Sequence, residues 1–280
     1  MSDIREGELK EVFDALEEAF HAKQIDFYLI GALARNIWYS RGSKGFRTTK
    51  DLDFAVMISN KDDYEAVRSY LIAHKGFRAT KGNSFIMISP EGVEIDILPF
   101  GEIEIDDEIK LSETGLTSIK VNGFMEVYQA GTEDVLLKTG HNFKVATLPA
   151  IVMLKLIAYD DRPEIRLKDA RDIINILTHY FDLQAEMIYE HHTDLFGEDE
   201  GSLSNVSAIV IGREMKKIVV NNDNLYQRLE GILTRQIELK ENSAFIRNMV
   251  NENNSNVEDI ILLLKNLLKG FIGTVRIGLN

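Results

Sequence analysis

The chain has 280 residues, of which 45% are hydrophobic and 28% charged, so it has the composition of a folded globular protein rather than a disordered or fibrous one. It contains no cysteine, which excludes disulfides and thiolate metal sites. The formal net charge of −13 argues against nucleic-acid binding over a broad surface. The length is sufficient for one large domain or two ordinary ones.

The N-terminal segment, MSDIREGELKEVFDALEEAF, is charged and amphipathic and lacks the apolar core of a signal peptide. The most apolar stretches, AIVMLKLIA and DIILLLKNLLKGFIG, are short and contain lysine, so neither is expected to span a bilayer. We therefore expect a cytoplasmic protein without a membrane partner.

Strand and helix patterns alternate over the first hundred residues. Apolar residues recur at helical spacing over 5–23, and FYLIG (27–31) has the pattern of a buried strand that ends in a glycine turn. The elements expected after it are, in order, a helix over 32–40, a loop over 41–50, a strand over 51–58, a helix over 61–74 and strands over 76–80, 84–89 and 93–100. This order predicts a small mixed sheet with helices packed on it.

The second half of the chain has a different pattern. Residues 101–145 are ambiguous, and LTSIKVNGFMEVYQA (116–130) is interpreted as strand pieces around a turn at Asn122-Gly123. From Leu148 onward helical periodicity dominates, which predicts helices over 148–161, 167–181, 204–220, 224–239 and 257–271.

Two aspartates, Asp51 and Asp53, interrupt the apolar strand predicted over 51–58. Residues i and i+2 of a strand share a face, so the two carboxylates are expected side by side, with Leu52 and Phe54 on the opposite face. Partly buried carboxylates repel each other unless a cation lies between them, and oxygen ligands of this kind select Mg²⁺ or Mn²⁺. The alternative is a pair of surface charges on an edge strand.

A third carboxylate is available in VEIDILPF (93–100), where Asp96 stands between two isoleucines. Glu94 shares its face, so either could be the third ligand, and Asp96 is favoured because it lies closer to the centre of the strand. The alternative role for Asp96 is a strand-end cap. Three carboxylates from two adjacent strands are typical of sites that hold two divalent ions for phosphoryl or nucleotidyl transfer.

An anion site is indicated upstream of these aspartates. In YLIGALARNIW a strand is followed by Gly31, Ala32 and a helix N-terminus, where backbone N–H groups can approach a phosphate. From Phe27 to Lys50 there is no acidic residue, and the alternative interpretation is a solvated loop with a chance charge bias. The cationic residues of this segment are Arg35, Arg41, Lys44, Arg47 and Lys50.

The order of a glycine with a small neighbour, D-x-D, and a later aspartate resembles the nucleotidyltransferase fold of the polymerase-β superfamily, with Ala32 where that motif has Gly or Ser. ATLPAIVMLKLIAYDDRPEIRLKDARDI (146–173) and IVIGREMKKI (209–218) resemble motifs of the AbiEii/AbiGii-type nucleotidyltransferase toxins. The resemblance covers roughly residues 20 to 220.

The resemblance implies an α+β nucleotidyltransferase domain over 1–146 and an α-helical domain over 147–280. It implies Asp51, Asp53 and Asp96 as metal ligands, Gly31 and Ala32 at the triphosphate, and Lys155 and Asp172 as an essential lysine and a later essential aspartate. Without it, Lys155 could be a snorkelling lysine and KDARD (168–172) a solvated helical face. Further nucleotide-binding candidates are Arg35, Arg47, Lys50, Lys168 and Asp169.

The expected function is metal-dependent transfer of a nucleoside monophosphate from an NTP to an acceptor hydroxyl, with Mg²⁺ or Mn²⁺ as cofactor. The resemblance implies RNA, such as tRNA, or a protein as acceptor, and a toxin role with an antitoxin partner. Two alternatives use the same fold. One is a non-catalytic nucleotide-binding or interaction protein, and the other is a transferase that modifies a small molecule such as an antibiotic.

Overall fold

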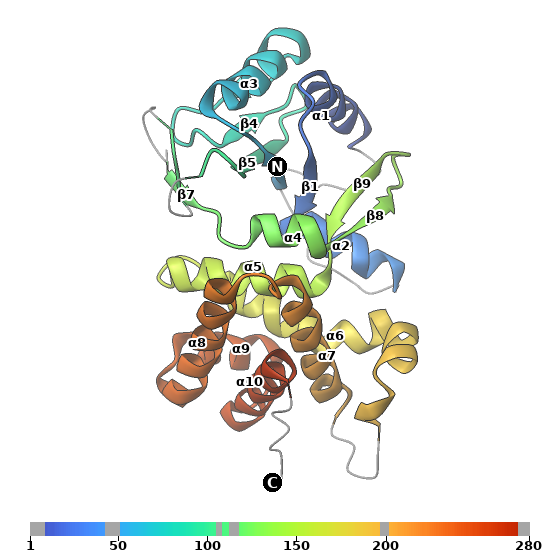
Figure 1. Ribbon diagram of the computed structural model, residues 1–280, viewed down its shortest axis with the longest axis vertical. Helices are drawn as coiled ribbons and strands as arrows, with labels where there is room; N and C mark the ends of the chain where they lie inside the picture. The colour runs from blue at the N-terminus through green and yellow to red at the C-terminus, as the bar shows by residue number, and fades with distance from the viewer. Residues whose placement is uncertain (1–8, 43–50, 105–107, 112–117, 197–201, 274–280) are drawn as a thin grey trace. The chain divides into compact units, whose positions relative to one another are not determined.

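The computed structural model describes residues 9–42, 51–104, 108–111, 118–196 and 202–273 (Figure 1). The chain divides into two compact units, Met1–Thr147 and Leu148–Asn280. The first residues of the helix predicted over 5–23 and most of the loop predicted over 41–50 lie outside the described ranges. Within those ranges, no helix combines the length and the apolar content that a membrane crossing requires.

The N-terminal unit is built on a mixed sheet, as the sequence predicts. The strand order is β3-β4-β5-β2-β1-β9-β8, in which β2 runs parallel to β5 and β1 parallel to β9, and the other neighbours are antiparallel. The strands are β1 (Phe27–Ile30), β2 (Asp51–Met57), β3 (Arg78–Ala79), β4 (Ile86–Ile88), β5 (Glu94–Phe100), β8 (Thr132–Leu136) and β9 (Asn142–Ala146). A separate hairpin pairs β6 (Glu108–Lys110) with β7 (Ser118–Lys120).

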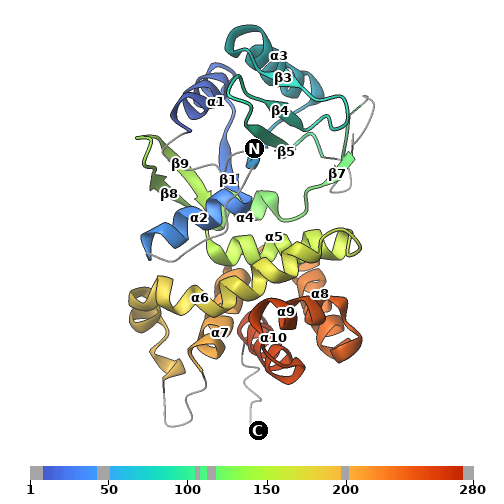
Figure 2. The ribbon, with the colours of Figure 1, turned by 180° about the vertical axis from the view of Figure 1, so that it is seen from behind.

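One face of the sheet is closed by α1 (Lys10–Ala22) and α3 (Lys61–Lys75), which lie side by side (Figures 1 and 2). Phe13 and Phe20 of α1 pack against Phe54 of β2, with ring centroids 6.2 and 6.1 Å away. The Tyr64 hydroxyl of α3 donates a hydrogen bond of 2.9 Å to the Ile97 carbonyl of β5. The alternation of β2 therefore directs Leu52 and Phe54 into this core and its aspartates to the other face.

The expectation of strand pieces after Gly123 is wrong, because residues Phe124–Ala130 form helix α4. Phe124 and Tyr128 are one helical turn apart, and both rings pack on Phe100, with centroids 6.3 and 5.9 Å away. The Tyr28 hydroxyl also donates to the Phe124 carbonyl at 2.8 Å. Aromatic and β-branched residues favour strands locally, but here their i, i+4 spacing and the uncovered apolar end of the sheet select a helix.

The C-terminal unit is helical, as the sequence predicts. Its helices are α5 (Leu148–Asp161), α6 (Leu167–His191), α7 (Leu203–Ile218), α8 (Asp223–Leu239), α9 (Ala244–Asn253) and α10 (Val257–Ile272). Short 3₁₀ turns follow α6 and α8, at η2 (Thr193–Leu195) and η3 (Lys240–Asn242). Helix α9 was not anticipated, because it is short and its asparagine-rich end weakens the helical pattern.

Candidate active site

Four carboxylates lie on one face of the sheet, at the N-terminal ends of β2 and β5. Asp53 stands in register with Asp96, and Asp51 with Glu94. Register partners on parallel strands share a face and lie about 4.8 Å apart. Asp51 is exposed and the other three are half-buried, while the neighbouring Leu52 is fully buried. The structure therefore brings together the three predicted metal ligands, and it sets Glu94 beside Asp51 rather than beside Asp53.

The covering of this face explains why the carboxylates stay accessible. Tyr28 is in register with Ala55, and Phe100 with Met57, so these four residues lie on the same face as Asp53. Helix α4 covers that end of the face through its aromatic contacts with Phe100. The opposite end, where the strands begin, carries the acidic side chains.

Gly31 is pressed against the Asp53 carboxylate. Ile30 pairs with Asp53 across β1 and β2, and the next residue, Gly31, opens helix α2 (Gly31–Arg41) with a φ of +69°. A Cβ atom built on Gly31 would lie 2.0 Å from Asp53 Oδ2, which is far inside van der Waals contact. Only glycine fits this position, and its absence of a side chain brings the carboxylate to the positive end of the α2 dipole.

The other predicted residues of α2 lie partly in the core. Arg35 is only 3% exposed, and its guanidinium donates to Asn36 Oδ1 at 3.2 Å and lies 5.9 Å from the Tyr39 ring centroid. Trp38 is buried and donates its Nε1–H to the Ala146 carbonyl at 2.7 Å. Ala32 is half-buried on the first turn. Arg47 and Lys50, with Lys44, lie outside the described residues.

The carboxylate face suits a hard divalent cation by the chemistry of its donors. All four side chains offer oxygen, with neither imidazole nor thiolate among them, which is the donor set of Mg²⁺ and Mn²⁺. Among the described residues, no group of three or more His, Asp or Glu side chains is arranged to hold a metal ion as it stands. The spacing of adjacent strands is short enough for rotation of the Asp53 and Asp96 side chains to bring their oxygens to one ion.

In the C-terminal unit, three predicted residues form one ion cluster. The Lys155 Nζ of α5 donates to Asp169 Oδ1 and to Asp172 Oδ2 of α6, both at 2.7 Å. The side chains of Lys155, Asp169 and Asp172 are 14%, 8% and 17% exposed. Asp169 and Asp172 are three residues apart, so one face of the helix carries both carboxylates to the same ammonium. Lys168, between them and α5 in sequence, is exposed.

Burial lowers the pKa of Lys155, but the charges of Asp169 and Asp172 and their hydrogen bonds outweigh it, so the pKa is raised overall. The ammonium therefore stays charged at neutral pH. Lys155 is the only charged residue between Leu148 and Tyr159, on a helix that is otherwise apolar and largely buried. Its pairing with both aspartates was not predicted, because sequence spacing gives no distance between two helices.

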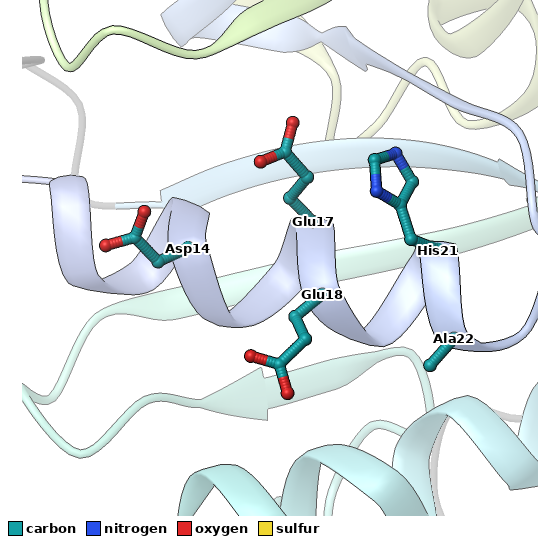
Figure 3. A pocket seen from close by; sticks show the side chains of 5 residues that line it. All are labelled: Asp14, Glu17, Glu18, His21 and Ala22. Carbon is teal, nitrogen blue, oxygen red and sulfur yellow. The ribbon is translucent and has the colours of Figure 1, made fainter.

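A surface pocket in the N-terminal unit lies apart from the predicted residues. It is lined by one side of α1, and Figure 3 shows its acidic side chains. Such a lining repels phosphate, so this pocket is a poor place for a nucleotide. The lining residues are Asp14, Glu17, Glu18, His21 and Ala22.

Comparison with known proteins gives a family but no near relative. No curated protein matches the chain significantly. The solution structure of the antibiotic-resistance factor ANT(2'')-Ia is 13% identical, with 68% of this chain and 99% of that chain covered and a TM-score of 0.38. The lincomycin-bound lincosamide antibiotic adenylyltransferase LnuA is 15% identical, with 66% and 99% covered and a TM-score of 0.36.

The profile of one protein family matches residues 14–252, which is most of the chain. The family is described as nucleotidyl transferase AbiEii toxin, type IV toxin–antitoxin system. Its match includes β2, β5 and the ion cluster of α5 and α6. The chain belongs to the AbiEii nucleotidyltransferase toxin family, and it is a nucleotidyltransferase.

Proposed function

We propose that the protein transfers a nucleoside monophosphate from an NTP to an acceptor hydroxyl at the carboxylate face of β2 and β5. The observation that carries this assignment is the register of Asp53 against Asp96, combined with the direct approach of Gly31 to the Asp53 carboxylate. Together they set an acidic pair beside a helix N-terminus. A divalent cation and a phosphate need these two environments next to each other.

Asp51, Asp53 and Asp96 would hold the divalent metal, Mg²⁺ or Mn²⁺, with Glu94 as the alternative third ligand. When bound, the metal supplies charge neutralisation of the triphosphate and activation of the acceptor oxygen. The strands orient the carboxylates for this task, because register and alternation put all four on one face. The buried core beneath Leu52 keeps that geometry rigid.

The triphosphate is assigned to the N-terminus of α2. The N–H groups of the first helical turn have no intrahelical acceptor, and the helix dipole favours an anion there. Gly31 and Ala32 leave the approach free of bulky side chains. Arg47 and Lys50 would add positive charge from the segment before β2, and the buried Arg35 would act by supporting α2 from within the fold.

Lys155 and Asp172 are proposed as further essential residues, with Lys168 and Asp169 as nucleotide-binding candidates on the same helix as Asp172. Their support is the ion cluster, which holds Lys155 and both aspartates in one fixed arrangement. An arrangement this well paired tolerates little change in any member.

We infer that the acceptor is RNA, such as tRNA, or a protein hydroxyl, and that the activity is that of a toxin controlled by an antitoxin protein. The family description supports the toxin role. A net charge of −13 restricts contact with RNA to a local cationic region rather than a broad surface. NTP and RNA substrates are consistent with action in the cytoplasm.

The test is incubation with Mg²⁺, each radiolabelled NTP and total RNA, comparing wild type with Asp53→Asn and the control Asp134→Asn. Asp134 is an exposed aspartate of β8 in the same sheet. We expect label in RNA or protein with wild type and the control, and a loss of at least about 100-fold with Asp53→Asn, the scale of removing one catalytic electrostatic group. Wild-type transfer by Asp53→Asn would contradict the site, and label reaching only an added small hydroxyl compound would contradict the acceptor class.

A further inference from the structure

The ion cluster of α5 and α6 contains more negative than positive charge. One ammonium, on Lys155, is shared by the carboxylates of Asp169 and Asp172 at 2.7 Å each. Both contacts are in the range of strong charge-assisted hydrogen bonds. Lys155 is therefore already compensated, and it would have to give up an aspartate to bind a phosphate as an open cation.

One oxygen of this cluster is buried and accepts no hydrogen bond. Asp169 Oδ1 is bonded to Lys155, but Asp169 Oδ2 has no hydrogen-bond donor among the residues that the structure describes. The nearest cation is the half-exposed Arg166, whose Nη1 lies 3.9 Å away, beyond hydrogen-bond distance. A buried acceptor left in this state costs about 1–3 kcal/mol, so it calls for a specific partner.

The chemistry of Asp169 defines what that partner is. Asp169 lies in the first turn of α6, where the helix dipole favours a negative charge, and its other oxygen is bonded to an ammonium. Both effects keep the carboxylate ionised. An ionised oxygen repels a phosphate and accepts strongly from a neutral hydroxyl or amino group.

We propose that Asp169 Oδ2 accepts a hydrogen bond from a neutral donor of the nucleotide, either a ribose hydroxyl or an exocyclic amino group of the base. Lys155 is then a positioning residue that fixes Asp169, rather than a phosphate-binding cation. The inference rests on the proposed function in one respect, that the nucleotide is the substrate. It changes the role of Lys155 from charge neutralisation to orientation.

The experiment measures nucleotide affinity by calorimetry without an acceptor, for wild type, Asp169→Asn, Lys155→Met and Lys155→Arg. Asp182→Asn serves as control, because Asp182 is an exposed aspartate of the same helix. The ligands are the four NTPs, their 2'-deoxy and 3'-deoxy forms, and inorganic triphosphate. Circular dichroism confirms that each variant is folded.

We expect wild type and Asp182→Asn to discriminate by about tenfold against the nucleotide that lacks the donor, which corresponds to one charge-assisted hydrogen bond. Asp169→Asn and Lys155→Met should reduce that ratio to about twofold or less, and Lys155→Arg should restore part of it. Affinity for inorganic triphosphate should change less than about twofold. A ratio that falls for the deoxy forms identifies the ribose, and one that falls among the four bases identifies the amino group.

Three results would overturn the inference. If Lys155→Met weakens inorganic triphosphate as much as it weakens NTP, Lys155 is a phosphate cation. If Asp169→Asn retains the wild-type ratio and only its melting temperature falls, Asp169 is structural. If wild type binds no NTP at all, the proposed function fails and the inference fails with it, which separates this case from the other two.

Discussion

At the scale of single residues, Gly31 has the tightest requirement in the N-terminal unit. Its positive φ excludes most side chains, and the Asp53 carboxylate occupies the space where a Cβ would lie. The two requirements have different origins, one in the backbone and one in the site. They can therefore be separated by comparison with a glycine that has only the first.

Gly31→Ala is expected to reduce nucleotidyl transfer by at least about tenfold, because displacing the Asp53 carboxylate by even 1 Å is costly in an oriented site. Gly92→Ala is the matched control, since Gly92 has a φ of +84° but nothing within 4 Å of its added Cβ. Both variants should lose about 1 kcal/mol of unfolding free energy from backbone strain, with a further loss only for Gly31→Ala. Equal activity and equal stability of the two variants would show that the contact with Asp53 is unimportant.

His192 is a second residue whose surroundings allow a sharp prediction. Its side chain is 5% exposed, with Nδ1 3.2 Å from Arg213 Nη1 and Nε2 3.3 Å from Glu214 Oε1. Arginine can only donate, so Nδ1 must be the acceptor and the ring neutral. Burial lowers the pKa of His192 although Glu214 opposes the shift, and the charges of Arg213 and Lys217 lower it further.

A lowered pKa means that the unfolded chain binds a proton before the folded one does. The free energy of unfolding should therefore fall as the pH drops below about 6.5, by up to about 1.4 kcal/mol per pH unit from this group. Urea titrations at pH 7.5 and 5.5 test this, with His192→Asn as comparison. The loss between the two pH values should be smaller in the variant, and an identical loss would contradict the role of His192.

At the scale of elements, α7 and α10 are held at a very short separation by two glycines. A Cβ on Gly212 would lie 2.2 Å from the Leu267 carbonyl oxygen, and one on Gly270 would lie 2.0 Å from the Ile209 carbonyl oxygen. The neighbouring atoms belong to backbone, which cannot move aside as a flexible side chain would. Glycine is unfavourable inside a helix, so its presence at both positions reflects this packing.

Gly270→Ala is expected to lower the free energy of unfolding by about 2–3 kcal/mol, because the helices must separate to admit the methyl group. Gly231→Ala is its counterpart on α8, where the added Cβ meets nothing within 4 Å. This control should raise the free energy of unfolding by up to about 1 kcal/mol, through helix propensity alone. Chemical denaturation measures both, and a stable Gly270→Ala would refute the close packing.

At the scale of the whole molecule, the chain divides at Thr147 and Leu148 into a unit built on a sheet and a unit built on helices. Each has its own buried core, with Phe54 and Phe143 in the first and Leu264 and Phe271 in the second. Residues 148–280 expressed alone are therefore expected to fold, with a helical circular dichroism spectrum and a cooperative urea transition. A fragment without such a transition would show that the helices depend on the sheet unit.

The sequence determined most of the elements and the identity of the acidic residues. Helices such as Lys61–Lys75 and strands such as Asp51–Met57 follow from apolar periodicity, which depends only on which residues must leave water. The spacing of Asp51 and Asp53 likewise dictates a shared face. The helix over Phe124–Ala130 was missed, because its local preference was overridden by the need to cover one end of the sheet.

Only the tertiary structure decided which distant residues meet. The register of β2 against β5 puts Asp53 beside Asp96, and the packing of α5 against α6 encloses Lys155 between two carboxylates. Neither contact can be calculated from spacing along the chain, because each depends on how separate elements bury their apolar surfaces against one another. The sequence alone specifies the chemical groups, and the packing of the core sets the distances between them.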